Sequence, residues 1–146
     1  MAESRATNNE PTYAPGMSRW FAESLTSAEQ LSVTGYDEYY GTVVVLAGEL
    51  DVASAHILTD YFAKLGARCN PHVVADVADL EFCDCVGLSA LVRAHNRATA
   101  AGGWLRLSAA TPRIRRLLYL TGLTRILACY PSVSAAFATP SVQPAG

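Results

Sequence analysis

The side chains best suited to chemistry in this sequence are the cysteine and histidine residues at positions 69 to 85. Cys69-x-x-His72 followed by Cys83-x-Cys85 offers four ligands of the kind that Zn²⁺ prefers. The spacing is poor for a metal, because His72 opens an apolar run typical of a buried strand and would point into the sheet. We therefore expect no metal site, and we expect thiols that stay reduced, as is usual inside cells.

A nucleophile, a base and an acid also lie close together in the chain. Ser89, His95 and Asp84 fall within twelve residues, on what we expect to be one loop and the helix that follows it. Helical spacing would not bring these three side chains into a relay. The sequence also lacks the motifs of serine hydrolases, nucleotide-binding loops, zinc proteases and dinucleotide-binding folds. It thus predicts a protein that is not an enzyme and that needs no cofactor.

The segment DLEFCDCVGLSAL, at residues 79 to 91, is the strongest candidate for a site. Asp84 is well placed to cap a helix that starts at Cys85, because its side chain can accept from the first backbone N–H groups. The first turn of a helix presents unpaired N–H groups and the positive end of the helix dipole. Such a turn can hold a phosphoryl group, either bound or covalently attached.

The elements that position this segment alternate between strands and helices. Apolar β-rich runs predict strands, and apolar residues at helical spacing, such as Leu58, Tyr61, Phe62 and Leu65, predict helices. The order ββαβαβαβα indicates an α/β domain with a small mixed sheet, in which a β-hairpin edge adjoins parallel strands flanked by helices. The expected strands are 31–36, 42–48, 72–77, 104–108 and 125–130. The expected helix limits are Asp84, Gly102-Gly103, Thr111-Pro112, Gly122, Ser132 and Ala138.

The two ends of the chain differ from this core in composition. Residues 1–30 are expected to form a flexible leader, in which apolar residues such as Trp20 favour a short docking helix over 17–30. Residues 139–146 are expected to form a disordered tail. A single domain over 31–138 remains.

Composition excludes several classes of protein. Apolar residues make up 51% of the chain and charged residues 16%, which is typical of a packed domain. The pI of 5.9 argues against a protein that binds nucleic acid by bulk electrostatics. No apolar run approaches the roughly 20 residues of a membrane span, and the N-terminus has no signal-peptide pattern. We therefore expect a cytoplasmic protein that binds neither nucleic acid nor membrane directly.

The net charge of −2 hides an uneven distribution. Residues 1–84 hold all 13 acidic residues and four basic ones, whereas residues 85–146 hold seven arginines and no acid. Either the two halves pair with each other in the folded domain, or a basic face is left for an acidic partner. That face would comprise Arg93, Arg97, Arg113, Arg115, Arg116 and Arg125.

Three segments resemble a known family. GELDVASA (48–55), VVADVADLEFCDCVGLSAL (73–91) and GGWLRLSAATPRIRRLLYLTGLTRIL (102–127) are similar, in order and spacing, to STAS domains and more narrowly to bacterial anti-sigma factor antagonists. The resemblance implies a single STAS-type domain. It also implies that the partner is an anti-sigma factor, a serine kinase with an ATP-binding fold, and that binding frees a sigma factor. In that family, phosphorylation of one serine at the start of the second helix releases the antagonist.

The sequence departs from the family at the residue that carries the phosphate. The family motif is Asp-Ser-Ser/Thr-Gly-Leu; here Cys85 takes the place of the first serine and Val86 that of the acceptor. Val86 has no hydroxyl and cannot be phosphorylated, and Ser89 lies about 4–5 Å further along the helix. We therefore predict that the usual phosphorylation switch is absent. The expected partner-binding residues are Asp51, Asp84, Cys85, Val86, Gly87, Leu88 and Ser89.

Asp51 has two compatible interpretations. It follows the second strand, where its carboxylate could cap the first helix through the N–H groups of Ala53 and Ser54. The resemblance implies that the same loop adjoins the phosphoacceptor loop and helps to form the partner surface.

The sequence is also compatible with other regulatory signals and with other partners. Cys85 in a first helical turn, where the dipole can lower a thiol pKa, and Cys83 just outside the cap would allow a thiol-based redox switch. Equally, the two cysteines would simply fill small apolar positions. A STAS scaffold subunit of a larger sensory assembly, bound to other STAS proteins or to itself through residues 1–30, is another alternative. A small-molecule or nucleotide sensor is a third.

Overall fold

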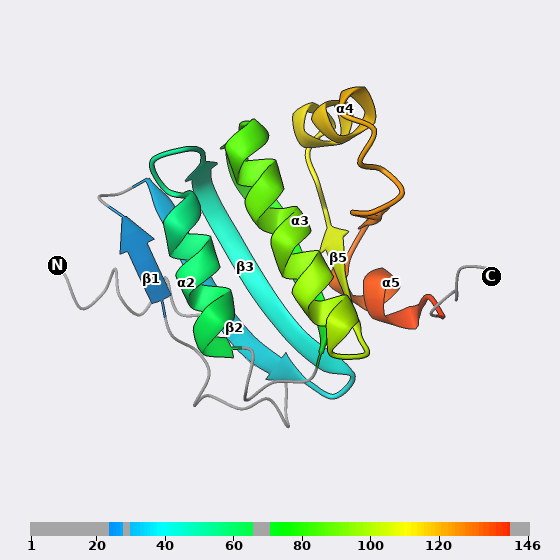
Figure 1. The fold of residues 1–146 in the computed structure, drawn as a ribbon. Helices are drawn as coiled ribbons and strands as arrows, with labels where there is room; N and C mark the ends of the chain where they lie inside the picture. The colour runs from blue at the N-terminus through cyan, green and yellow to red at the C-terminus, as the bar shows by residue number, and fades with distance from the viewer. Residues whose placement is uncertain (1–23, 28–29, 66–70, 141–146) are drawn as a thin grey trace, which may run out of the picture.

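The computed structural model describes residues 24–27, 30–65 and 71–140 (Figure 1). One mixed sheet of six strands runs through the molecule, and its strands lie side by side in chain order. They are β1 (Ser24–Ser27), β2 (Leu31–Glu38), β3 (Gly41–Leu50), β4 (His72–Cys83), β5 (Trp104–Ser108) and β6 (Cys129–Tyr130). The first three strands pair antiparallel, and β3 to β6 pair parallel. The expected mixed sheet with a hairpin edge is confirmed.

Helices cover both faces of this sheet. In the described residues they are α2 (Ala55–Leu65), α3 (Cys85–Ala100), α4 (Pro112–Leu120) and α5 (Val133–Ala138). Figure 1 shows α2 and α3 side by side across one face, and α4 near the end of the sheet where α3 begins. α5 packs against β4, β5 and β6. None of these helices is both long enough and apolar enough to cross a membrane.

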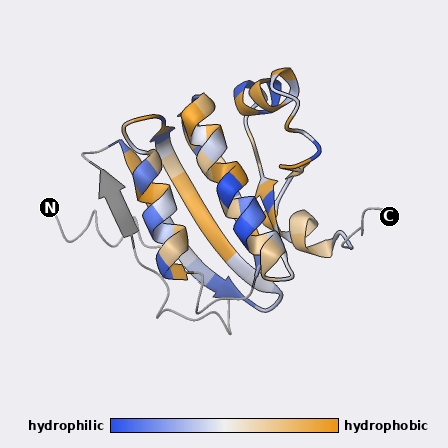
Figure 2. Cartoon of the chain, viewed as in Figure 1, coloured by the Kyte–Doolittle hydropathy of each residue, from blue (hydrophilic) through white to orange (hydrophobic). Residues whose placement is uncertain are grey.

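The main core lies between the sheet and the pair α2 and α3. Leu58 and Leu65 of α2 and Leu91 of α3 are buried in the same cluster as Leu46 of β3 and Leu107 of β5. Figure 2 shows the hydrophobic strand β3 behind α2 and α3, whose turns alternate between hydrophilic and hydrophobic residues. The helical spacing of the apolar residues therefore predicted the correct buried faces.

The predicted helix limits are confirmed by their caps. Thr111 Oγ1 accepts a hydrogen bond from the N–H of Ile114 at 3.3 Å, and Ser132 caps α5 in the same way. Gly102 and Gly122 follow α3 and α4 with φ angles of 91° and 74°. This left-handed backbone is one that glycine adopts without steric cost.

Three expected element limits are wrong. Residues 24–27 form a strand, not part of a helix over 17–30, because their backbone pairs with β2; residues 17–23 lie outside the described part. β4 continues six residues beyond the expected end at 77, because two bulges in its pairing with β3 keep the ladder going to Cys83. β6 is only two residues long, because the residues before it form turns.

Arg106 ties the C-terminal residues to the sheet. Its buried guanidinium donates to the carbonyl oxygens of Ala136 at 2.6 Å, Thr139 at 2.7 Å and Pro140 at 3.3 Å. It also lies 3.8 Å from the ring centroid of Trp104, which is a cation–π geometry. The expected tail over 139–146 is thus wrong for its first two residues, which are bound to the domain; residues 141–146 are outside the described part.

Candidate functional site

Asp84 links two loops at the start of α3. One carboxylate oxygen accepts from the N–H of Gly87 at 2.8 Å, as an N-cap should, and the other accepts from the N–H of Val52 at 3.2 Å. Its own N–H donates to the carbonyl of Leu50 at 3.2 Å. A single residue therefore holds the loop between β3 and α2 against the first turn of α3.

Asp51 organises that same loop. One carboxylate oxygen accepts from the N–H groups of Ala53 at 2.9 Å and Ser54 at 3.1 Å, as the sequence predicts. The other accepts from the side-chain amide of Gln30 at 2.6 Å. The buried Ser54 hydroxyl donates to the carbonyl of Glu49 at 2.7 Å. The loop is thus held by side chains from both of its ends.

Gly87 and Leu88 lie on the buried side of the first turn of α3, below the site. A Cβ added at Gly87 would lie 2.5 Å from the carbonyl oxygen of Leu50, so a larger residue would push α3 away from β3. Leu88 is only 2% exposed. α3 therefore turns the Leu88 side chain into the core, which leaves it little surface for apolar contact with a partner.

Three large apolar side chains remain exposed around Asp84. Val52 is 72% exposed, Phe82 40% and Val86 43%, and they come from the loop, the end of β4 and the first turn of α3. We call these three residues the apolar edge. The sequence pointed to Val86 but missed Val52 and Phe82; the pairing of Val52 with Asp84 is a tertiary contact with no local signal.

Ser89 is the hydroxyl nearest in sequence to Val86 on α3. It is exposed, and its Oγ donates to the carbonyl oxygen of Cys85 at 3.0 Å, within its own helix. The outer surface of the first turn of α3 thus consists of Cys85 and Val86, with the Ser89 hydroxyl engaged one turn later.

Comparison with known proteins agrees with this arrangement. The family model for the STAS domain matches residues 30–136.

The chain belongs to the STAS family.

It is 30% identical over 100 residues to a protein of Mycobacterium tuberculosis with a provisional assignment as an anti-anti-sigma factor, covering 67% of this chain and 68% of the relative. The crystal structure of an anti-sigma factor antagonist from Mycobacterium paratuberculosis is 28% identical, with a TM-score of 0.67 over 77% of this chain and 95% of that one. A provisionally assigned anti-sigma factor antagonist of Thermotoga maritima is 27% identical, with a TM-score of 0.58 over 64% and 83%. The single α/β STAS fold is therefore established.

The described cysteines of this STAS domain are free and differ in environment. Cys83 is buried, and burial, the Asp84 charge and Cys85 together raise its pKa from 9.0 to about 12. Its Sγ lies 3.5 Å from the carbonyl oxygen of Asp84. Cys85 is exposed on the first turn of α3. Of these two thiols, Cys85 is the one open to solvent, whereas Cys83 is buried and stays protonated at neutral pH.

The three residues considered for a catalytic relay, Ser89, His95 and Asp84, contact other groups and not one another. The Asp84 carboxylate accepts from backbone N–H groups, and His95 Nε2 lies 3.4 Å from Thr99 Oγ1, one turn along α3. With the Ser89 hydroxyl bonded to its own helix, these three side chains form no Ser–His–Asp chain. Over the described ranges no group of three potential metal ligands occurs; Cys69 lies outside them.

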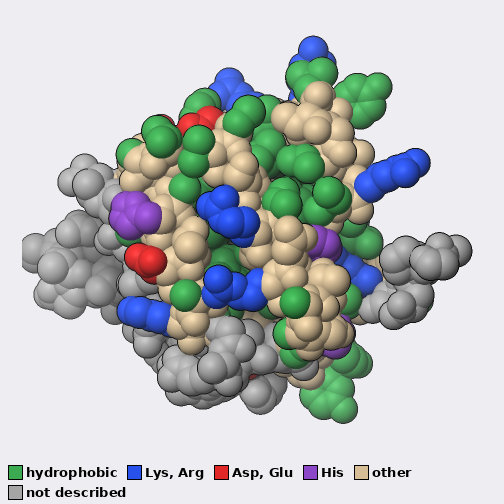
Figure 3. Space-filling model, viewed as in Figure 1, with side chains coloured by type: hydrophobic (Ala, Val, Ile, Leu, Met, Phe, Trp, Pro, Cys, Tyr) green, Lys and Arg blue, Asp and Glu red, His purple; other side chains and the backbone are tan. Residues whose placement is uncertain are grey.

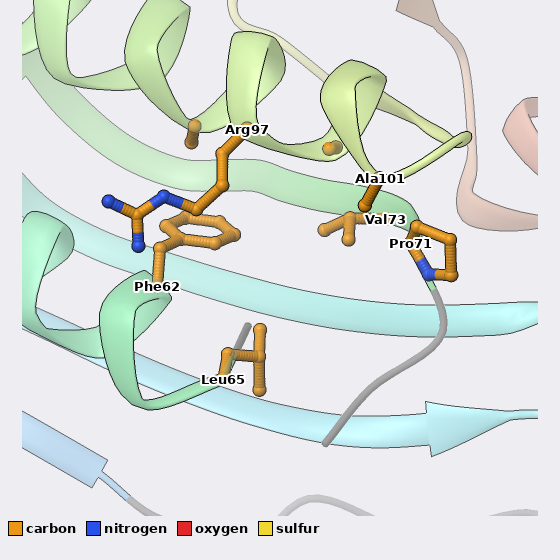
Figure 4. Close-up of a pocket in the computed structure, with 8 residues that line it drawn as sticks. Phe62, Leu65, Pro71, Val73, Arg97 and Ala101 are labelled. Carbon is orange, nitrogen blue, oxygen red and sulfur yellow. The ribbon is translucent and has the colours of Figure 1, made fainter. Parts of the chain in front are cut away.

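Two of the hollows that flank α3 differ in size and place. A cavity of about 50 Å³ lies between the C-terminal part of α3 and α2, where Figure 4 shows Phe62 and Arg97 facing each other and Leu65 and Val73 nearby. It is far smaller than the roughly 300–1,000 Å³ of a typical ligand pocket. A groove of about 430 Å³ adjoins the first turns of α3 and is lined by Cys85, Leu88, Ser89, Val92, Arg93, Thr121 and Leu123. The groove, and not the cavity, is continuous with the site.

The two charged halves of the sequence do not pair within the described part of the chain. The six arginines of the predicted basic face form no ion pair there: Arg93, Arg97, Arg113, Arg115, Arg116 and Arg125. Figure 3 shows basic side chains over α3 and around α4, and acidic ones at the upper edge and over α2. Within the described residues these arginines are therefore not neutralised by direct ion pairs.

Proposed function

We propose that this STAS domain is an anti-sigma factor antagonist that binds an anti-sigma factor of the ATP-binding serine kinase fold. Binding frees a sigma factor in the bacterial cytoplasm, and the protein itself catalyses no reaction. The observation that carries the proposal is the apolar edge, held in place by Asp84 at the first turn of α3. Its likeness to anti-sigma factor antagonists at 27–30% identity supports the same class of partner.

The contact would centre on Val86, flanked by Val52 and Phe82. Exposed apolar side chains around a fixed loop are typical of the centre of a protein interface. Asp51 and Asp84 would act mainly by positioning, since their carboxylates already accept from the backbone. Cys85 and Ser89 would line the adjoining rim along the groove.

A titration of the purified anti-sigma kinases of the source bacterium tests this function. Val86→Asp should weaken binding at least about tenfold, because it places a charge at the centre of an apolar contact. Tyr39→Asp is the matched control, since Tyr39 is also exposed and apolar but lies in the turn between β2 and β3. The proposal is wrong if no kinase binds the wild type, or if both variants bind as the wild type does.

We further propose that binding is not released by phosphorylation at position 86. Val86 has no hydroxyl to accept a phosphoryl group, and the Ser89 hydroxyl is bonded within α3 one turn away. An anti-sigma kinase with ATP should leave the intact mass of the wild type unchanged. Val86→Ser should gain one phosphoryl group, whereas the control Cys85→Ser should not. A phosphate mapped to residues 84–89 of the wild type would contradict the proposal.

A further inference from the structure

Two exposed surfaces of opposite charge lie at the same end of this molecule. β4 and β5 are parallel, and α3 and α4 follow their carboxyl ends, so both helices begin at one edge of the sheet (Figure 1). Each of the two charged surfaces also carries large exposed apolar side chains.

The first surface is the outer face of α4. Arg115, Arg116, Tyr119 and Leu120 follow one another at i, i+1, i+4 and i+5, which puts them on one side of the helix. The opposite side carries Ile114 and Leu118, both buried. Tyr119 is 75% exposed and Leu120 64%. We call Arg115, Arg116, Tyr119 and Leu120 the α4 face; Figure 3 shows basic and hydrophobic side chains together in this region.

The arginines of α4 do not stabilise their own helix. Arg113, Arg115 and Arg116 lie in its first half, where the helix dipole is positive and no acidic residue accompanies them. Basic residues at that end are unfavourable for the helix. None of the three forms an ion pair within the described part of the chain. These three arginines therefore present unpaired positive charge, which carboxylates on another surface can approach.

The second surface carries such carboxylates. Glu49 on β3 pairs in register with Phe82 on β4, and Asp79 and Glu81 precede Phe82 on the same strand. All three acidic side chains are exposed, and none has an ion-pair partner in the described residues. We call Glu49, Asp79 and Glu81 the acidic edge. It adjoins Phe82 of the apolar edge, so this surface also combines charge with exposed apolar area.

We propose that a second copy of this chain docks its α4 face onto the acidic edge and Phe82. Because both surfaces lie at one end, a twofold axis lets each copy supply both of them, and the contact closes as a dimer. Arginine–carboxylate pairs would surround a centre of Tyr119, Leu120 and Phe82. A nucleic acid fits these surfaces less well, because the pI is 5.9 and the centre of the α4 face is apolar.

One consequence rests on the proposed function. Phe82 belongs to the apolar edge, so the dimer would cover part of the surface that binds the anti-sigma kinase. Self-association would then compete with kinase binding and would set how much antagonist is free.

Sedimentation over a range of protein and salt concentrations tests the dimer with charge-reversed variants. Arg115→Glu/Arg116→Glu and Glu49→Arg/Glu81→Arg should each raise the dimer dissociation constant at least about a hundredfold, because like charges then face each other twice. Mixed together, the two variants should form a heterodimer as tight as the wild-type dimer, since both contacts again join opposite charges. Arg93→Glu/Arg97→Glu is the matched control, with the same charge change on the exposed side of α3.

These measurements test the dimer and the proposed function independently of each other. A wild type that stays monomeric at every concentration, a dimer that ignores charge reversal, or two variants that fail to pair would each overturn the dimer. Kinase binding by the wild type is measured on its own, below the concentration at which the dimer forms. If the wild type binds no kinase there while the dimer results hold, the proposed function fails and the dimer stands.

Discussion

The two helices that follow parallel strands β4 and β5 begin in the same way and yet differ in what their caps do. Asp84 and Thr111 each accept a hydrogen bond from the N–H three residues on, at 2.8 Å and 3.3 Å. The Thr111 side chain has no further hydrogen bond to a described residue. Asp84 has a second carboxylate oxygen, which reaches Val52 in the loop after β3. One cap thus sets a local helix start, whereas the other also joins two segments distant in sequence.

The largest effect is expected from the glycine inside the Asp84 turn. Gly87→Ala should lower the free energy of unfolding by about 3 kcal/mol, because the added Cβ would meet the carbonyl oxygen of Leu50 at 2.5 Å. Gly122→Ala, after α4, should cost only about 1 kcal/mol, since its Cβ meets nothing and only the positive φ is strained. Urea denaturation measures both. Equal losses would show that α3 can move away from β3 at little cost.

Removal of each cap separates the local role of Thr111 from the wider role of Asp84. Asp84→Ala should cost about 2 kcal/mol, because it leaves the N–H groups of both Gly87 and Val52 without their acceptor. Thr111→Ala should cost about 1 kcal/mol, the usual value for one cap. Hydrogen exchange should speed up at Val52 only in the first variant. An unchanged exchange rate there would show that Asp84 does not hold the loop.

The buried thiol next to the Asp84 cap predicts a pH dependence. The pKa of Cys83 is raised from 9.0 to about 12, so above pH 9 the unfolded chain loses this proton while the folded chain keeps it. The unfolded state is therefore favoured as the pH rises, and stability should fall by about 1 kcal/mol between about pH 8 and pH 10. Cys83→Ala should lack this part of the loss. A variant with the same alkaline slope as the wild type would rule out Cys83 as its source.

The smallest effect is expected at Ser89. Its exposed hydroxyl bonds only to the carbonyl of Cys85 in its own helix, so Ser89→Ala should change the free energy of unfolding by less than about 0.5 kcal/mol. The same denaturation series provides the measurement. A loss as large as that of Asp84→Ala would mean that Ser89 supports the site through a contact beyond α3.

Local signals predicted much of the fold and part of the site. The caps at Asp84, Thr111 and Ser132 were correct because each depends on bonds to backbone within three residues. The length of β4 was not predictable, because its last residues are held by pairing with β3 across two bulges. Val52 and Phe82 were missed for the same reason, since each joins the apolar edge only through contacts with a distant segment.

The sequence by itself determined the order of elements, the buried helix faces and the lack of a hydroxyl at Val86, because these follow from residue type and short-range spacing. The tertiary structure decided which residues share a surface. It turned Leu88 inward and left Val52, Phe82 and Val86 outside, and it left the arginines of α4 without acidic partners among the described residues. The physical reason is that burial and charge pairing depend on segments brought together by the sheet, which spacing along the chain does not encode.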